Sequence, residues 1–150
     1  MRVYLTTTAD RALDCLRAGF TDLDEEDGRT GVYLASRPLG ADDGFPGDVT
    51  LCVDLAEPEF VRHAVGRGAP YLLSLVPATE LCHVGQPRVW DHFYVGLSRR
   101  DLLESAALWE SGDGLPDGRG HGGALRAAVR FLDEAGWATP LKRTAGRPVD

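Results

Sequence analysis

The stretch Arg2-Val3-Tyr4-Leu5-Thr6-Thr7-Thr8, together with Gly31-Val32-Tyr33-Leu34-Ala35-Ser36, decides the fold that we expect for this chain. β-Branched and aromatic residues over 2–5 predict a short strand, and the threonines that follow predict the start of a helix, with Thr8 or Asp10 as its N-cap. Apolar residues then recur at helical spacing as far as Gly19, a residue type that often ends helices. The second quoted stretch predicts another strand, so the chain opens as strand, helix, strand.

The rest of the chain alternates between short apolar strands and helical segments. Expected strands cover 48–55, 71–76 and 90–95, and expected helices begin at Glu57, cover 101–108 after an N-cap at Ser98, and cover 124–135. Glycine and proline over 37–47 argue against a full helix there. About five or six short strands with a few helices indicate a single α+β domain whose sheet is mixed and mostly antiparallel.

Composition suggests where the segments of the chain begin and end. We expect a compact body over residues 1–110 and a flexible loop over 111–123, because glycine, aspartate and proline dominate that loop. Helical periodicity over 124–136 predicts a helix that docks on the body through its apolar stripe. The tail over 137–150 has little to bury and is expected to be disordered. The acidic segment 22–29 has no apolar period and is expected to be a mobile loop.

Overall composition and charge exclude several classes of function. The chain has 150 residues, of which 43% are hydrophobic and 26% charged, as is usual for one globular domain. Its formal net charge of -7 argues against non-specific binding to nucleic acid or anionic membranes. Apolar runs are too short to span a bilayer, and charged residues interrupt the first 20 positions where a signal peptide would need an apolar core. We therefore expect a cytoplasmic protein without a membrane partner.

The residues that often carry chemistry show no established spacing. Cys15, Cys52 and Cys82 form no CxxC pair and lie in apolar segments, which predicts reduced and buried thiols. No metal site is predicted, because the histidines and their neighbours lack HExxH or paired-cysteine spacing. The chain has no GxSxG elbow, and the glycine-rich segment 112–118 is acidic and would repel phosphate.

The opening of the chain resembles the ADP-ribosyltransferase superfamily. In that superfamily a strand ending in Tyr-His-Gly-Thr precedes a helix that closes in Gly-Phe or Gly-Leu, and a strand of the form Gly-Val-Tyr-Leu-Ala-Ser follows. Ala18-Gly19-Phe20 and Gly31 to Ser36 carry the resemblance here, while Leu5 stands in the place of the histidine and Thr6 in the place of the glycine. The resemblance implies an ADP-ribosyltransferase-like fold that binds NAD as substrate and transfers ADP-ribose to a protein or nucleic-acid acceptor.

The same resemblance implies a set of site residues. Tyr33 stacks on nicotinamide, the backbone of Thr6 holds the carboxamide, and Ser36 is the small hydroxyl residue that follows the tyrosine. Asp91 stands where the superfamily has a late acid that orients the nicotinamide ribose. Tyr33 and Asp91 are thus the expected catalytic residues, and Tyr33, Thr6 and Ser36 the expected cofactor-binding residues. Breaking the bond between nicotinamide and ribose develops positive charge on the ribose, so catalysis would depend on orientation and electrostatic stabilisation.

Three alternatives stay open. A non-catalytic binding or interaction module on the same scaffold would fit the loss of the histidine at Leu5. A relative of the RNA 2'-phosphotransferases would need cationic side chains around a phosphate, for which Arg37, Arg88 and Arg99 are available. An unrelated α+β protein would use Tyr33 as a core residue and Asp91 as a turn cap. The observation that separates them is whether Tyr33, the Thr6 backbone and Asp91 converge on one cleft.

Overall fold

The computed structural model describes residues 1–24, 28–65, 70–94, 96–110 and 116–137. Its strands are β1 (Arg2–Thr7), β2 (Leu23–Asp24), β3 (Thr30–Ala35), β4 (Val49–Asp54), β5 (Leu73–Val76) and β6 (Arg88–His92). Its α-helices are α1 (Ala9–Ala18), α2 (Glu57–Arg62), α3 (Ala78–Leu81), α4 (Arg99–Glu110) and α5 (Pro116–Ala135). A short 3-10 helix, η1 (Ala41–Asp43), lies in the connection between β3 and β4.

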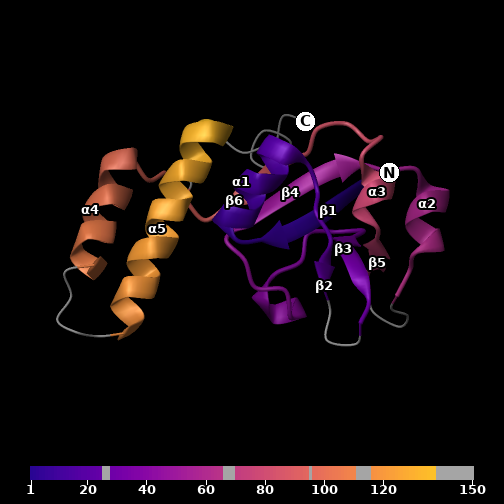
Figure 1. The fold of residues 1–150 in the computed structure, drawn as a ribbon, viewed down its shortest axis with the longest axis horizontal. Helices are drawn as coiled ribbons and strands as arrows, with labels where there is room; N and C mark the ends of the chain where they lie inside the picture. Colours follow the sequence, from indigo (N-terminus) through magenta and orange to yellow (C-terminus); the bar gives the residue numbers. More distant parts are fainter. Residues whose placement is uncertain (25–27, 66–69, 95, 111–115, 138–150) are drawn as a thin grey trace.

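The strands form one sheet with the order β2-β3-β1-β4-β6, and β5 also pairs with β3 (Figure 1). Every strand pairing within the described ranges is antiparallel. This confirms the predicted small single-domain α+β fold. The sheet was predicted to be mixed and mostly antiparallel, and its described pairings are all antiparallel. β1 pairs with β4 along its whole length, from Arg2 opposite Asp54 to Thr7 opposite Val49.

Alternation along β1 gives the sheet a core face and an opposite, more polar face. Val3 and Leu5 are buried and belong to one core cluster with residues of α1 and α5, including Ala12 and Phe131. The burial pattern of β1 alternates strictly, so Arg2, Tyr4 and Thr6 lie on the other face and are only partly buried. The position of Leu5 is therefore a core position.

The capping chemistry predicted for the first helix is present. Thr8 is the N-cap of α1, and its side chain accepts a hydrogen bond from the Arg11 N–H. Gly19 ends the helix with φ of 85°, a conformation that costs glycine little. In α4 the Ser98 hydroxyl accepts from the Asp101 N–H at 3.1 Å, as expected for its N-cap. Only the three-residue η1 forms within the glycine- and proline-rich segment 37–47, which agrees with the expected absence of a full helix.

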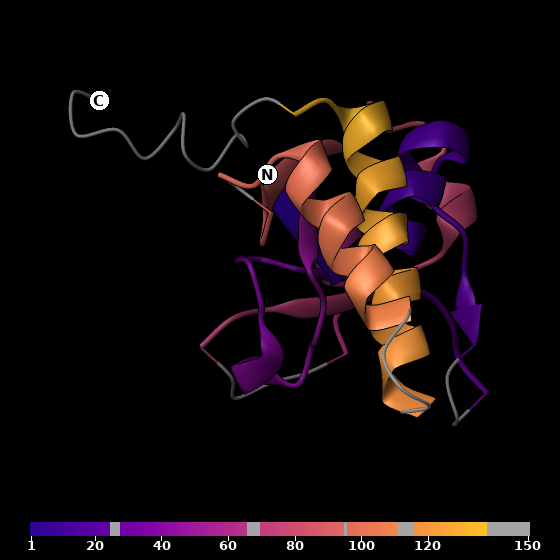
Figure 2. The same cartoon turned by 90° about the vertical axis from the view of Figure 1, so that its left-hand side faces the viewer.

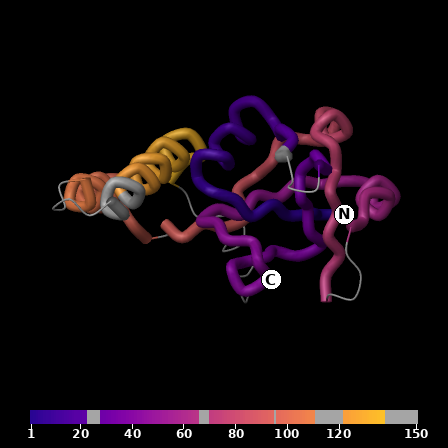
Figure 3. Tube along the Cα trace, turned by 60° about the horizontal axis from the view of Figure 1, so that its bottom comes forward, coloured from indigo at the N-terminus to yellow at the C-terminus, as the bar shows by residue number. Residues whose placement is uncertain are grey.

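Two helices at the carboxyl end pack beside the sheet as an antiparallel pair. α5 lies between α4 and the sheet, as Figures 2 and 3 show from two directions. α5 begins at Pro116, so the prediction of a flexible loop over 111–123 is wrong for 116–123. Proline suits the first turn of a helix, and Gly122, one of the glycines that suggested a loop, lies close to α4, where an added Cβ would be 2.5 Å from the Glu110 Cγ. Residues 111–115 and the predicted tail from 138 onward lie outside the described residues.

Two further expectations from the sequence are corrected. The strand expected over 90–95 is β6 at Arg88–His92, and Phe93 and Tyr94 already belong to the turn that follows. All three cysteines are free, as expected, but Cys82 is exposed rather than buried because it lies in the turn after α3.

Among the described helices none is both long enough and apolar enough to cross a membrane. The expected loop over 22–29 contains the short strand β2, and its residues 25–27 lie outside the described ranges.

Candidate functional site

In the described part of the chain, the ladder of paired residues between β1 and β3 consists of one pair. Tyr4 of β1 pairs with Ala35 of β3. The same antiparallel register, continued by two residues, would place Thr6 opposite Tyr33. The strands diverge before this pair forms, and β3 continues its pairing with β5 along the other edge, where Tyr33 lies opposite Leu75. We call the resulting gap between Thr6 and Tyr33 the slot.

The backbone of Thr6 faces the slot. In an antiparallel strand, the main-chain groups of successive residues point to opposite neighbours. At the start of β1 the carbonyl of Met1 accepts a hydrogen bond from the Leu55 N–H at 2.8 Å, so odd-numbered residues of β1 direct their groups toward β4. The groups of Tyr4 and Thr6 therefore point toward β3. At Tyr4 they meet Ala35, and at Thr6 they meet the slot.

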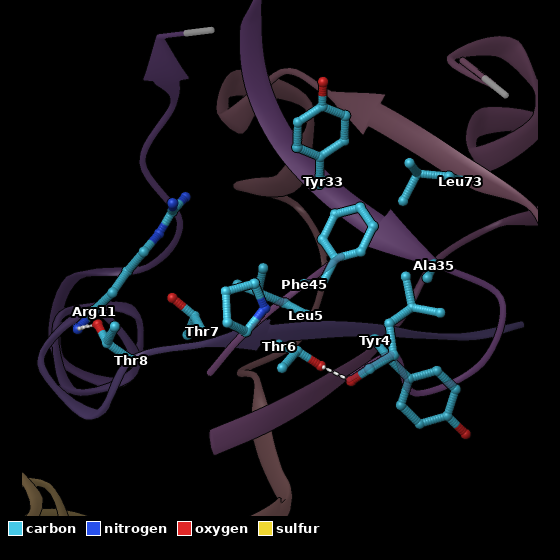
Figure 4. A pocket seen from close by; sticks show the side chains of 12 residues that line it. Tyr4, Leu5, Thr6, Thr7, Thr8, Arg11, Tyr33, Ala35, Phe45 and Leu73 are labelled. Carbon is cyan, nitrogen blue, oxygen red and sulfur yellow. Dashed lines mark hydrogen bonds between the residues drawn. The ribbon is translucent and has the colours of Figure 1, made fainter. Parts of the chain in front are cut away.

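The slot contains a cavity of about 200 Å³. The rings of Tyr33 and Phe45 form one side, with centroids 6.1 Å apart in an edge-to-face arrangement. In Figure 4 the ring of Phe45 lies between Tyr33 and Thr6, and Arg11 lies at the end away from Tyr4. Among the described residues that line this cavity, Arg11 alone carries a charge. The remaining lining residues are Leu5, Thr7, Thr8, Ala35, Leu39, Pro46 and Leu73.

A larger cavity of about 1270 Å³ adjoins the slot. We call it the groove; it is lined by the start of α1, part of α5, the segment before β4 and the end of β6, including Asp48, Asp91, Phe93 and Arg130. The residues that line both cavities are Thr6, Thr8, Leu39 and Pro46. Slot and groove are therefore separate cavities with a shared wall.

Thr6 holds this shared wall in place. Its hydroxyl donates to the Leu39 carbonyl at 2.7 Å and lies 3.2 Å from the Thr50 hydroxyl. The segment before β4 is also packed directly on β1, because a Cβ added at Gly47 would lie 2.6 Å from the Thr7 carbonyl oxygen. The side chain of Thr6 thus has a structural role, while its backbone is directed into the slot.

The residues expected from the sequence are distributed over these two cavities. Tyr33 lines the slot, Asp91 lines the groove, and Thr6 lines both. Thr6, Thr50 and Asp91 follow one another across β1, β4 and β6, which places Asp91 about 10 Å from Thr6 at the usual strand spacing. Ser36 lines neither cavity, because its hydroxyl accepts a hydrogen bond from the Leu72 N–H at 2.8 Å.

The end of β6 is tied to the segment before β4 at the back of the groove. The Tyr94 hydroxyl donates a hydrogen bond to the Asp48 carboxylate. Burial is the largest cause of a raised pKa of the Tyr94 phenol, and this hydrogen bond is the second. His92 is buried beside Phe131, and its Nδ1 accepts from the Tyr94 N–H at 3.0 Å.

Two slot residues were not expected from the sequence. Phe45 is an aromatic residue in a glycine- and proline-rich connection, and such an isolated ring is a weak signal for a binding loop. Arg11 follows the N-cap Thr8 by three residues, which places it in the first turn of α1 beside the slot. Its guanidinium also donates to the Thr21 carbonyl at 3.1 Å. A helical arginine with no neighbouring motif gives no local indication of a site.

Metal binding finds no support in the described residues, where no group of three or more histidine, cysteine or acidic side chains is arranged to hold an ion. Comparisons of this chain with protein-family models, with curated proteins and with solved structures find no match. The interpretation of the site therefore depends on its own geometry.

Proposed function

We propose that this protein is ADP-ribosyltransferase-like and binds NAD, or a related nucleotide, with the nicotinamide ring in the slot. The observation that carries the proposal is the slot itself, because Tyr33, Phe45 and Thr6 line one cavity where the β1–β3 ladder stops. The resemblance of the sequence assigns these two positions to nicotinamide stacking and to carboxamide binding.

The size and polarity of the slot support this assignment. About 200 Å³ is less than the roughly 300 to 1,000 Å³ of pockets that enclose a whole drug-sized ligand, so the slot suits one substituted ring. Aromatic side chains at Tyr33 and Phe45 provide flat apolar surface, and the Thr6 main chain provides one donor and one acceptor for a carboxamide. Arg11 places positive charge at one end, where the phosphates of a dinucleotide would leave the slot.

Transfer of ADP-ribose adds a requirement for an acid near the reacting carbon. The bond from C1' of the ribose to nicotinamide breaks, the electron pair leaves with nicotinamide, and the ribose becomes positively charged until a nucleophile adds and loses its proton. Asp91 would stabilise this charge from the groove across the shared wall. An aspartate about 10 Å from Thr6 would require the ribose to extend from the slot toward the groove.

A second candidate is a non-catalytic nucleotide-binding module on the same scaffold. Its support is that Tyr33 and Asp91 line different cavities, and that the position of the superfamily histidine is the core residue Leu5. Both candidates place the nicotinamide ring in the slot and differ in whether the bond to ribose is broken.

Calorimetric titration with NAD on three proteins tests the proposal. Wild type and Tyr33→Phe should bind NAD, because both keep the ring, and Tyr33→Ala should lose binding. Tyr33 is only partly buried. Tyr33→Ala should therefore lower the free energy of unfolding by clearly less than the roughly 3 to 5 kcal/mol that is typical when a fully buried aromatic residue is replaced by alanine. If Tyr33→Ala remains folded and binds NAD as wild type does, the slot is not the NAD site.

Release of nicotinamide from NAD separates the two candidates. Wild type should release nicotinamide with water as acceptor, and Asp91→Asn should bind NAD but release nicotinamide much more slowly. Binding without release by wild type would favour the non-catalytic module.

A further inference from the structure

An aromatic ring of the chain itself fills the place that the proposed function assigns to nicotinamide. The Phe45 ring lies between Tyr33 and Thr6, and all three residues line the slot (Figure 4). Its centroid is 6.1 Å from the centroid of the Tyr33 ring, within the roughly 4.5 to 7 Å that separate aromatic rings in contact. No second ring fits between Tyr33 and Phe45. A nicotinamide ring that stacks on Tyr33 in front of Thr6 therefore requires Phe45 to move.

The segment that carries Phe45 is fixed at both of its ends. We call residues 40–46 the flap. Before the flap, Leu39 is buried and its carbonyl accepts a hydrogen bond from the Thr6 hydroxyl at 2.7 Å. After the flap, the Asp48 N–H donates to the Thr7 carbonyl at 3.1 Å. The exposed residues of the flap are Ala41, Asp42, Gly44 and Pro46. The flap can thus move while both of its ends stay in place.

An ion pair holds the flap in its present position. The Arg37 guanidinium donates to one carboxylate oxygen of Asp43 at 3.1 Å, and the Gly40 N–H donates to the other at 3.1 Å. These two bonds, that from Arg37 first, lower the pKa of the Asp43 carboxyl. The Arg37 guanidinium also lies 4.7 Å from the centroid of the Tyr71 ring. Because the side chains of Arg37 and Asp43 are 42% and 24% exposed, solvent screens the pair and its contribution is modest.

We infer that Phe45 is an autoinhibitory residue, whose ring closes the slot until the flap opens. The inference rests on the proposed function for the identity of the ligand. With the flap open, nicotinamide stacks on Tyr33, and Phe45 lies beside the ligand rather than between Tyr33 and Thr6. The affinity that is measured is then reduced by the fraction of molecules whose flap is open. Removal of the Phe45 ring should therefore strengthen binding.

Calorimetric titration of the full chain with nicotinamide, and separately with NAD, tests the inference. Phe45→Ala should bind both roughly two- to tenfold more tightly than wild type, the range that corresponds to the loss of one edge-to-face aromatic contact. If Phe45 were instead a fixed wall that stacks on the ligand, the same variant would bind more weakly. Phe93→Ala is the matched control, because it removes an exposed phenylalanine ring that does not line the slot, and its affinity for nicotinamide should equal that of wild type.

Asp43→Asn tests the flap with the Phe45 ring still present. Both carboxylate oxygens of Asp43 accept hydrogen bonds, and an asparagine amide can accept at only one of these two positions. The variant should hold the flap less firmly and bind nicotinamide more tightly than wild type. Thermal unfolding shows that each variant is folded. If Phe45→Ala fails to fold, Asp43→Asn decides, and an affinity equal to that of wild type would overturn the inference.

The two ligands distinguish failure of the inference from failure of the proposed function. Equal or weaker binding of nicotinamide by folded Phe45→Ala overturns the inference, even where wild type binds NAD. Tighter binding of nicotinamide by Phe45→Ala, with no NAD binding by any of the proteins, supports the closed slot and overturns the assignment of NAD. Absence of nicotinamide binding by wild type and by every variant overturns both.

Discussion

Thr6 combines a structural and a proposed binding role in one residue. Its side chain bonds Leu39 and approaches Thr50, which fixes the wall between slot and groove. Its backbone points the other way, toward the place where β3 would have continued the ladder. A glycine at this position would have the same main-chain groups and would lose the wall contact. The departure from the superfamily pattern at Thr6 therefore leaves the proposed carboxamide contact intact.

The three cysteines should differ sharply in reactivity. Cys15 and Cys52 are each 1% exposed, and burial raises the pKa of both thiols, which lowers their thiolate fraction. Cys82 is exposed, with its thiol donating to the Thr79 carbonyl at 2.9 Å. A thiol reagent at mildly alkaline pH should label one cysteine of the native chain rapidly and all three after unfolding. Cys82→Ser should abolish the rapid phase, and rapid labelling that persists in this variant would contradict the assignment.

Part of the lining of the candidate site could be predicted from the sequence for a physical reason. Tyr33 and Thr6 lie on strands whose patterns are strong, so their positions across a sheet follow once the strands are recognised. Phe45 and Arg11 could not be found in this way, because a loop ring and a helical arginine reach the slot only through tertiary packing. Asp91 was expected in the same cleft as Tyr33 and lies across the shared wall, since the sequence does not show where the β1–β3 ladder stops.

The α4–α5 pair shows how two helices use glycine at their contact. A Cβ added at Gly122 would lie 2.5 Å from the Glu110 Cγ and 3.3 Å from the Ala106 carbonyl oxygen. Glu110 is held by Arg126, whose guanidinium also donates to its second carboxylate oxygen at 2.8 Å. This hydrogen bond lowers the pKa of the Glu110 carboxyl. An alanine at Gly122 would therefore have to displace the Glu110 side chain.

Adjacent glycines of α5 should respond differently to the same substitution. Gly123→Ala meets no atom within 4 Å and should raise stability by about 0.5 to 1 kcal/mol, the usual gain in a helix interior. Gly122→Ala has the same helix-propensity gain, but Glu110 must move and its exposed ion pair with Arg126 is disturbed, so this variant should be less stable than Gly123→Ala by about 0.2 to 1 kcal/mol. Thermal unfolding of both variants measures the difference. Equal stabilisation by the two would mean that α4 does not pack against this part of α5.

The elements were predictable where local signals agree. α1 has an N-cap, a helical apolar stripe and a terminal glycine, and its bounds follow from these three features. The first eight residues of α5 have the composition of a loop and are helical in the structure, where Gly122 packs closely against Glu110 of α4. Local propensity was overruled by packing between helices, which a single sequence does not show.

At the scale of the whole molecule, the segment before β4 joins the two cavities to the sheet. Gly47→Ala should displace this segment, because the added Cβ would lie 2.6 to 2.8 Å from backbone atoms of Thr7, which cannot rotate away. We expect a loss of about 1 to 3 kcal/mol in unfolding free energy and weaker NAD binding. Gly40→Ala is the matched control in the same segment, since nothing lies within 4 Å and its φ of -139° suits alanine. Equal stability and equal NAD binding in the two variants would contradict this description of the shared wall.

The single pair between Tyr4 and Ala35 also has a mechanical consequence. β3 with β5 forms one multi-residue ladder, and β1 with β4 forms another, while within the described ranges only this pair connects β1 to β3. A change in the angle between the two ladders would strain the Tyr4–Ala35 pair and leave the hydrogen bonds within each ladder unchanged. The two ladders are thus joined at the slot by one backbone pair, and the Phe45 ring, which lies between Tyr33 and Thr6 and packs edge-to-face on Tyr33, takes the place of the absent pair and braces the two halves against each other (Figure 4).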